Sequence, residues 1–202
     1  FDPETMTAAD VTQWVQRTQD ECGQTLDQLR RREAWPGLLG DRVAQVLAAE
    51  PALRARIDQV ARLAPAHLKT RLHGDLHLGN IARVEGRIVV FDGIDFNAHL
   101  RWIDVASEIA FTAMDLEDRG RPDLAHRFVD AYLSITGDYA GLALLSFYVV
   151  YRARVRAKVA ALRADQLAAA DGRASVDLEC AGYVALARRH ATAGRPGIVV
   201  TH

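Results

Sequence analysis

The feature that most constrains the fold is one pair of short β-prone runs inside a chain whose other apolar residues follow a helical period. The runs, residues 80–84 and 87–91, flank Glu85-Gly86, and two central residues with glycine second suit a tight hairpin turn. On both sides of the runs, apolar residues recur at steps of three and four, the period of one helix face. We therefore predict a mainly α fold with a small β-hairpin near its middle.

The same pattern sets the expected boundaries of the helices. Apolar residues begin to recur at helical steps from Val11, and Pro51 and Pro122 each suit the first turn of a helix. The expected helices span residues 38–49, 51–65, 100–118, 122–137 and 139 to about 162, and Ser175 caps a last one. Residues 164–175 are expected to form an exposed loop. The residues expected in the core include Trp14, Trp102, Tyr148, Leu178, Tyr183 and Leu186.

Composition bounds the class of protein. The chain has 202 residues, half of them hydrophobic, and a formal net charge of -1, so it can bury a substantial core and has no charge bias towards nucleic acid. Its two cysteines, Cys22 and Cys180, lie far apart and in no ligand pattern, which favours a reducing compartment. No apolar run approaches the ~18 residues of a membrane span, and no signal peptide is recognisable. We expect a cytoplasmic protein without membrane or nucleic-acid partners, and we take the natural start to be missing because the first residue is Phe1.

Dense polar groups frame the predicted hairpin: residues 71–80 read RLHGDLHLGN and residues 89–97 read VVFDGIDFN. Because a hairpin folds the chain back beside its own start, we expect the side chains of Asp75, Asn80 and Asp92 to converge. Their oxygens suit Mg²⁺, which takes one or two protein ligands and completes its shell with water and phosphate oxygens. That leaves Asp75 free to accept a proton from a hydroxyl, which is the division of labour that phosphoryl transfer needs.

Two other interpretations of these residues stay open. The segment could be a decorated turn, or His73 and His77 could bind zinc together with a carboxylate. The zinc interpretation fits less well, since the two histidines lack the spacing of a helical HExxH motif and Asn80 would have no purpose.

The letters HGDLHLGN, then a hairpin, then FDGIDFN resemble the catalytic segment of the aminoglycoside phosphotransferase and choline kinase superfamily, a branch of the protein-kinase-like fold. The resemblance implies the helical C-lobe of such a kinase, with ATP and Mg²⁺ as its cofactors. It also implies that Asp75 is the catalytic base, that Asn80 is a magnesium ligand and that His73 supports the loop. We expect His77 to hydrogen-bond within the loop and not to act as a catalyst.

The next metal ligand in this superfamily is an aspartate after the hairpin, and two residues compete for that role. Asp95 reproduces the letters Ile-Asp-Phe, whereas Asp92 reproduces the spacing, twelve residues after Asn80 and twelve before Asp104. We expect Asp92 to be the direct ligand and Asp95 to support it or to hold a second metal ion. Asp104 would then anchor the backbone of the catalytic loop.

Residues 91–120 and 138–162 also resemble a group of bacterial proteins in which a phosphotransferase-like domain precedes a P-loop ATP-binding domain. GIVV at 197–200 has the pattern of a buried strand that would lead into such a domain. We therefore expect residues 1–195 to form the kinase-like C-lobe and residues 196–202 to begin a following, truncated domain.

Before the catalytic segment, this chain differs from the pattern of the family. Kinase-like enzymes carry a Gly-rich loop and a phosphate-binding lysine on an N-terminal sheet, and residues 1–70 contain no such pattern and only one lysine, Lys69. We therefore take the N-lobe to be absent and expect the fragment alone to be inactive.

The predicted function is an ATP-dependent phosphotransferase that moves a γ-phosphate to a hydroxyl of a small molecule. The alternative is a catalytically inactive kinase-like module that regulates a P-loop ATPase domain or presents substrate to it. The substrate-binding residues stay unknown, because aminoglycosides, sugars and amino alcohols are equally compatible with the sequence. The basic residues of the helix over 139–162 pair on two faces, Arg152 with Arg156 and Arg154 with Lys158. We expect solvated faces; the alternative is that one arginine lines the acceptor pocket and pairs with an anionic substrate.

Overall fold

The computed structural model describes residues 4–5, 7–31, 68–167 and 170–192, together with residues 40, 41, 44, 48, 51 and 55. Its helices are α1 (Ala8–Arg31), α4 (Ala98–Arg101), α5 (Val105–Asp118), α6 (Pro122–Thr136), α7 (Leu142–Gln166) and α8 (Ala170–Thr192), and its 3₁₀ turns are η2 (Leu78–Asn80) and η3 (Tyr139–Gly141). Its strands are β1 (Glu4–Thr5), β2 (Leu68–Arg71), β3 (Ile81–Val84), β4 (Arg87–Val90) and β5 (Trp102–Asp104). The prediction of a mainly α fold with a small β-hairpin is confirmed. In the described part of the chain, no helix combines the length and the apolar character that a membrane crossing requires.

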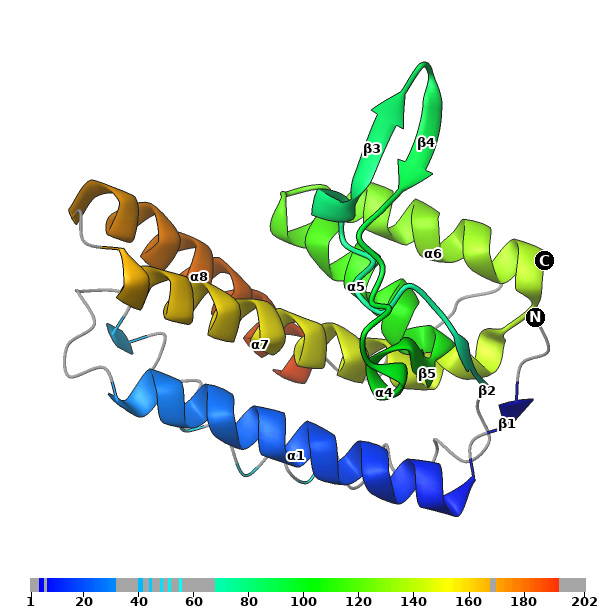
Figure 1. Cartoon of the computed structure of the whole chain (residues 1–202), viewed down its shortest axis with the longest axis horizontal. Coiled ribbons are helices and arrows are strands. Elements are labelled where there is room, and N and C mark those ends of the chain that lie inside the picture. Colours follow the sequence, from blue (N-terminus) through cyan, green and yellow to red (C-terminus); the bar gives the residue numbers. More distant parts are fainter. Residues whose placement is uncertain are drawn as a thin grey trace.

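The core lies where α7 and α8 run side by side and α5 packs against α7 (Figure 1). Alanines such as Ala153 and Ala157 are fully buried on α7 and let the two long helices approach closely, while Phe111 and Met114 of α5 fill the remaining space. Leucine, alanine and unbranched polar residues dominate these segments and favour the helix. The core therefore makes a rigid support for whatever α5 and α7 carry.

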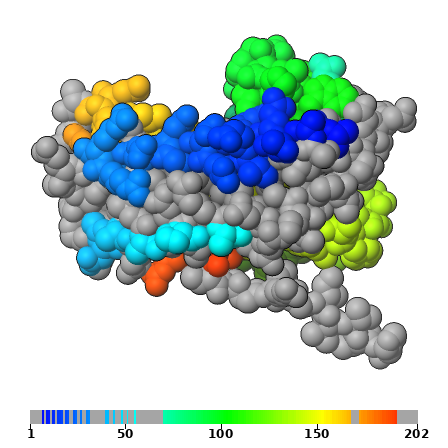
Figure 2. All heavy atoms as spheres, turned by 90° about the horizontal axis from the view of Figure 1, so that it is seen from below, coloured from blue at the N-terminus to red at the C-terminus, as the bar shows by residue number. Residues whose placement is uncertain are grey.

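On its other side α7 faces α1, which runs below it in Figure 1. Lys158 of α7 donates a hydrogen bond to Gln24 Oε1 of α1 at 2.7 Å, and Arg17 of α1 donates to His99 O of α4 at 2.5 Å. Figure 2 shows α1 as a blue ridge across this face of the molecule, with the green surface that includes α4 beside its first half. Helix α1 thus joins the core to the segment around α4.

A three-stranded antiparallel sheet in the order β1-β2-β5 was not predicted. Arg71 at the end of β2 pairs with Trp102 at the start of β5, so the chain enters the 72–80 loop next to the point where α4 passes into β5. The prediction of one helix over 100–118 was wrong at its start, because the backbone of 102–104 pairs with β2 and α5 begins only at Val105. Trp102, predicted in the core, is 40 % exposed on this strand.

The hairpin of β3 and β4 forms where it was predicted and projects away from the helices (Figure 1). Glu85 and Gly86 have φ angles of 49° and 80°, as a two-residue type I′ turn requires at both central positions. Beyond the strands, Phe91 N donates to Asn80 O at 3.0 Å. This last bond closes the base of the hairpin beside the two polar segments.

The predictions for the C-terminal half were partly right. Helix α6 begins at Pro122, and Gly137 ends it with φ 70°, as expected. The prediction of an exposed loop over 164–175 was wrong, because α7 continues to Gln166 and α8 begins at Ala170. The alanines of this segment favour helix. Ser175, predicted to cap the last helix, lies inside α8. Tyr183 and Leu186 are buried as predicted, whereas Leu178 is 72 % exposed. The predicted helices of 38–49 and 51–65 fall where only single residues are described, and residues 196–202 and the side chain of Trp14 lie outside the described part.

Candidate active site

The loop between β2 and β3 passes very close to α4. Gly74 has φ +88°, and a Cβ atom there would lie 2.6 Å from Leu100 O, closer than two such atoms can approach. Only glycine combines that backbone angle with the missing side chain. Gly74 therefore lets the loop lie flat against residue 100 and presents the next residue, Asp75, at the surface.

Three buried polar side chains on one face of α5 hold this loop through its backbone. The bonds run from Gly74 N to Glu108 Oε1 and Oε2 (3.2 and 3.1 Å), from Thr112 Oγ1 to Leu76 O (2.8 Å) and from Leu78 N to Asp115 Oδ2 (2.9 Å). Spacings of four and three residues place the three side chains on the same side of the helix. Because they bind every second residue of the loop, the position of Asp75 is tied to the core.

None of these three α5 residues was predicted from the sequence to belong to the site. The signal was nevertheless present: in VASEIAFTAMDLED, the polar residues Glu108, Thr112 and Asp115 recur at helical spacing among apolar and small ones. A polar stripe on a helix with a buried face requires hydrogen-bond partners, since unpaired buried polar groups are costly. The loop just before the hairpin provides them.

Asp75 and Asn80, two of the three side chains expected to converge, lie in contact. Asn80 Nδ2 donates to Asp75 O at 3.0 Å and to Asp75 Oδ2 at 3.2 Å, and His77 Nε2 lies 3.5 Å from the same Oδ2. The hydrogen bond from His77, aided by the charge of Arg152 and by Asn80, lowers the pKa of Asp75 although partial burial opposes the shift. The Asp75 side chain is 40 % exposed, so an ionised carboxylate faces solvent at neutral pH.

Both histidines hydrogen-bond within the segment, and their partners define their tautomers. His73 Nε2 donates to Phe91 O at 2.8 Å, while its Nδ1 accepts from Asp75 N at 3.3 Å. His77 Nδ1 accepts from Gly79 N at 3.0 Å, which leaves the proton on the Nε2 that faces Asp75. With all four ring nitrogens engaged in this way, the geometry disfavours zinc binding, and within the described ranges no group of three or more His, Cys, Asp and Glu side chains could hold a metal ion.

The metal-ligand candidates lie at the base of the hairpin. Asp92 follows directly after the Phe91–Asn80 bond, is exposed, and has φ 59°, a strained region that aspartate tolerates better than most residues. Asp95 is also exposed and lies three residues further along, after Ile94 N has bonded to His73 O at 2.9 Å. The donor chemistry fits Mg²⁺: Asn80 uses its Nδ2 for Asp75, which leaves its amide oxygen to bind a cation, and the exposed Asp92 follows the backbone bond that closes the hairpin base.

Asp104 stands at the junction of β5 and α5. Its Oδ1 accepts from Ala106 N at 2.7 Å, which caps α5, and its Oδ2 accepts from Tyr148 OH at 3.0 Å. Both side chains are fully buried, and burial raises the pKa of Tyr148 well above its usual range. The α5 residue whose carboxylate holds the Gly74 amide of the loop is Glu108, one turn further along. Burial raises the pKa of Glu108 above its ordinary value.

The basic residues of α7 are not all solvated, contrary to expectation. Arg152 and Arg154 are buried. Arg152 lies over the ring of Phe111, 4.7 Å from its centroid, and donates to Gly74 O at 3.3 Å and to Ser107 O at 3.4 Å. It therefore supports the 72–80 loop through the carbonyl of Gly74, the residue whose amide N donates to Glu108.

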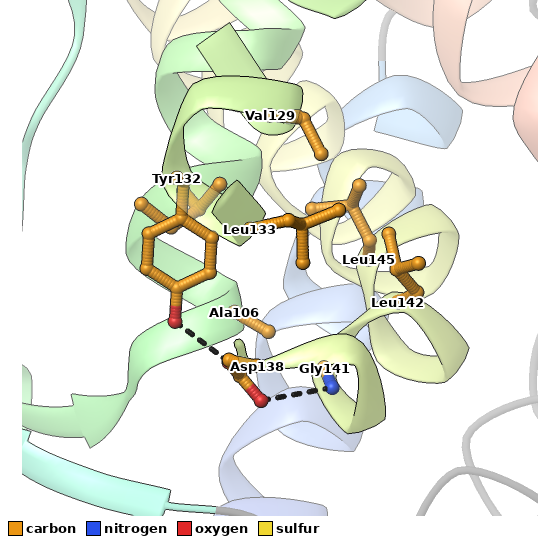
Figure 3. Close-up of a pocket in the computed structure, with 9 residues that line it drawn as sticks. Ala106, Val129, Tyr132, Leu133, Asp138, Gly141, Leu142 and Leu145 are labelled. Carbon is orange, nitrogen blue, oxygen red and sulfur yellow. Dashed lines mark hydrogen bonds between the residues drawn. The ribbon is translucent and has the colours of Figure 1, made fainter. Parts of the chain in front are cut away.

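Among the cavities of the described part of the molecule, two differ clearly in size and lining. One of about 210 Å³ opens beside Asp75, with Arg152 among its lining residues. The other, about 10 Å³, lies between α6, η3 and α7, where Tyr132 donates to Asp138 at 2.6 Å (Figure 3). The second has room for about one water molecule, and its walls are mostly apolar, so it is a packing gap. The first is the one that adjoins the polar loop.

Comparisons with known proteins agree with this geometry. The model of the phosphotransferase enzyme family matches residues 6–145, which is more than half of the chain. The uncharacterized proteins Rv2004c of Mycobacterium tuberculosis (strain ATCC 25618 / H37Rv) and Mb2027c of Mycobacterium bovis are each 36% identical over 118 residues, 58% of this chain and 23% of their own length. The chain thus spans about a quarter of these relatives, and no solved structure matches it significantly. By its family match, and by a loop, hairpin and helical lobe of the kinase-like kind, the chain belongs to the phosphotransferase enzyme family.

Proposed function

We propose that the chain is the C-lobe of an ATP- and Mg²⁺-dependent kinase that phosphorylates a hydroxyl group of a small molecule. The observation that carries the proposal is the hydrogen-bonded pair of Asp75 and Asn80. One member is an exposed, ionised carboxylate beside a cavity, and the other has an amide oxygen to spare. Family membership supports phosphoryl transfer, and the acceptor type and the use of ATP are part of the proposal.

In this mechanism the acceptor hydroxyl donates a hydrogen bond to Asp75. The hydroxyl oxygen forms a bond to the γ-phosphorus, the bond from that phosphorus to the β,γ-bridging oxygen breaks, and ADP leaves. The hydroxyl proton passes to the Asp75 carboxylate. Because the pKa of Asp75 is lowered, this carboxylate is a weak base, so its main contribution is to orient the hydroxyl while the proton moves late in the reaction.

The remaining polar residues position these two. Asn80 and Asp92 would hold Mg²⁺, with Asp95 as its support or as ligand to a second ion, and the bound metal supplies positive charge that offsets the charge of the phosphate oxygens. His73 and His77 keep the loop in shape, and Asp104 fixes the start of α5. We further propose a cytoplasmic protein without membrane or nucleic-acid partners. An attached N-lobe and a P-loop domain in the longer natural protein also belong to the proposal.

The test is Asp75→Asn in the full-length protein. The amide has nearly the same size but cannot accept the proton, so turnover should fall by about 10²- to 10⁴-fold while ATP binding is kept. Asp130→Asn, an exposed position on α6, is the matched control and should leave turnover unchanged. Normal turnover of the Asp75 variant would refute the assignment and favour a kinase-like module without activity.

A second pair of variants tests the metal ligands. Asp92→Ala should weaken Mg²⁺-dependent nucleotide binding more than Asp95→Ala does, because Asp92 directly follows Phe91, whose N donates to Asn80 O. Isothermal titration with ATP, with and without Mg²⁺, measures the difference. The reverse order would give the direct role to Asp95.

A further inference from the structure

The cavity beside Asp75 is small and has both polar and apolar walls. Its volume of about 210 Å³ lies below the roughly 300–1,000 Å³ of pockets for drug-sized ligands. Apolar side chains such as Ile103 of β5 and Val155 of α7 form part of the wall. A molecule of monosaccharide size with a carbon backbone fits this space better than one with several rings.

The acidic groups at the cavity are already engaged. Asp75 accepts from His77 and Asn80 and is reserved for the acceptor hydroxyl. Asp104 is fully buried and accepts from Ala106 N and Tyr148 OH. Neither carboxylate is therefore available to bind an amino group of the acceptor.

The basic groups at the cavity, unlike the acidic ones, remain available to bind a group of the acceptor. Arg17 of α1 lines the cavity, is half-buried, and is held by its hydrogen bond to His99 O. Among the residues that the structure describes, no carboxylate pairs with Arg17. Arg152 lies on another wall, where Glu108 and Asp75 partly offset its charge. A guanidinium that no carboxylate of the described residues neutralises, at the edge of a partly apolar cavity, favours a ligand with one negative charge.

We propose, resting on the proposed function, that the acceptor is a monosaccharide-sized hydroxy acid whose carboxylate binds Arg17 while one of its hydroxyls lies at Asp75. The apolar wall packs against its carbon chain. The Arg17 guanidinium, which no carboxylate of the described residues neutralises, matches the single charge of a carboxylate, and Arg152 adds a second positive wall that disfavours cationic amino sugars. Arg17 is then a specificity-determining residue, and Asp75 remains the group that acts on the hydroxyl.

The test compares three open-chain probes of the same length: D-gluconate, which is anionic, D-sorbitol, which is neutral, and D-glucamine, which is cationic. Each is given to the full-length protein with ATP and Mg²⁺; binding is measured by titration and transfer by ADP release. We expect gluconate to bind and react best and glucamine worst. Arg17→Gln should reduce the preference for gluconate over sorbitol by about 10- to 100-fold, the effect of losing one charge-assisted pair.

Two further variants separate specificity from structure. Arg17→Lys keeps the charge and should retain part of the preference, whereas Arg127→Gln, at an exposed position on α6 that lines neither cavity, should leave it unchanged. Loss of the α1–α4 contact alone would weaken all three probes equally, without changing their ratio.

The outcomes distinguish this inference from the proposed function. Asp75-dependent transfer to sorbitol or glucamine in preference to gluconate, or a preference that survives Arg17→Gln, overturns the inference and leaves the kinase assignment intact. Binding of none of the probes also overturns it. Arg17-dependent binding of gluconate without transfer to any hydroxyl compound supports the pocket and refutes the kinase.

Discussion

Thr112→Val removes one hydroxyl from the face of α5 that holds the 72–80 loop and keeps the β-branched shape of the side chain. In the folded protein Thr112 is buried, and its hydroxyl donates to Leu76 O at 2.8 Å, one residue after Asp75. The bonds of Glu108 and Asp115 to the loop remain. The variant therefore measures how much one of the three α5 side chains that hold the loop contributes to stability and turnover.

The expected effect has two parts. Leaving the partly buried Leu76 carbonyl without its donor should cost about 1–2 kcal/mol of unfolding free energy. For a chain of this size, 1 kcal/mol corresponds to roughly 2–4 °C in Tm, so the Tm should fall by roughly 2–8 °C. Because Asp75 is adjacent to the lost bond, we also expect turnover to fall by about 10-fold or more, since small errors in the placement of a catalytic group have large effects on rate.

The assay is thermal and urea unfolding followed by circular dichroism, together with turnover in the full-length protein. Thr136→Val is the matched control, because its hydroxyl also donates to a backbone carbonyl, Tyr132 O, at 2.8 Å but is exposed on α6. The control should change unfolding by less than about 0.5 kcal/mol. If Thr112→Val matches the control in both stability and turnover, the anchoring argument is wrong.

Two further changes test the buried charges around the loop. Tyr148→Phe should lower the free energy of unfolding in urea by about 1.5–3 kcal/mol, because the Asp104 carboxylate loses a hydrogen bond. The control Tyr139→Phe, at an exposed position, should leave the free energy of unfolding almost unchanged. Equal losses in the two variants would contradict this. Glu108→Gln addresses pH: burial raises the pKa of Glu108 above the usual 4.5, so wild-type stability should fall as pH rises from that value through the raised pKa. The glutamine keeps an acceptor for Gly74 N but does not titrate, so the variant should gain stability relative to wild type across this interval. If the stability of both proteins changes with pH in parallel, the charge of Glu108 is not the cause of the pH dependence.

Local patterns predicted those parts of the molecule whose structure depends on neighbouring residues. The hairpin follows from Glu85-Gly86 between two β-prone runs, and Pro122 and Gly137 mark the two ends of α6. The contact of Asp75 with Asn80 follows from their place in one loop. The family resemblance came from the same segment, while the family model extends further, over residues 6–145.

Predictions failed where partners are distant in the sequence. Strands β1, β2 and β5 have two to four residues each, which is too short for an alternating pattern to be recognised. Their partners are also far apart in the sequence, since Lys69 pairs with both Glu4 and Asp104. Propensity in turn favoured helix at residues 164–166 and 170–175, where a loop was predicted.

The sequence by itself determined the chemistry available to this protein: an aspartate, an asparagine and further aspartates placed on either side of a hairpin, and a set of helices long enough to support them. Only the tertiary structure decided which side chains hold that loop and which face the cavity. Glu108, Thr112 and Asp115 became anchors, and Arg152 became buried, because tertiary packing brings side chains of both α5 and α7 to the backbone of the loop. Burial and hydrogen-bond partners are properties of segments that meet in space, and the periodicity of a single helix cannot specify them.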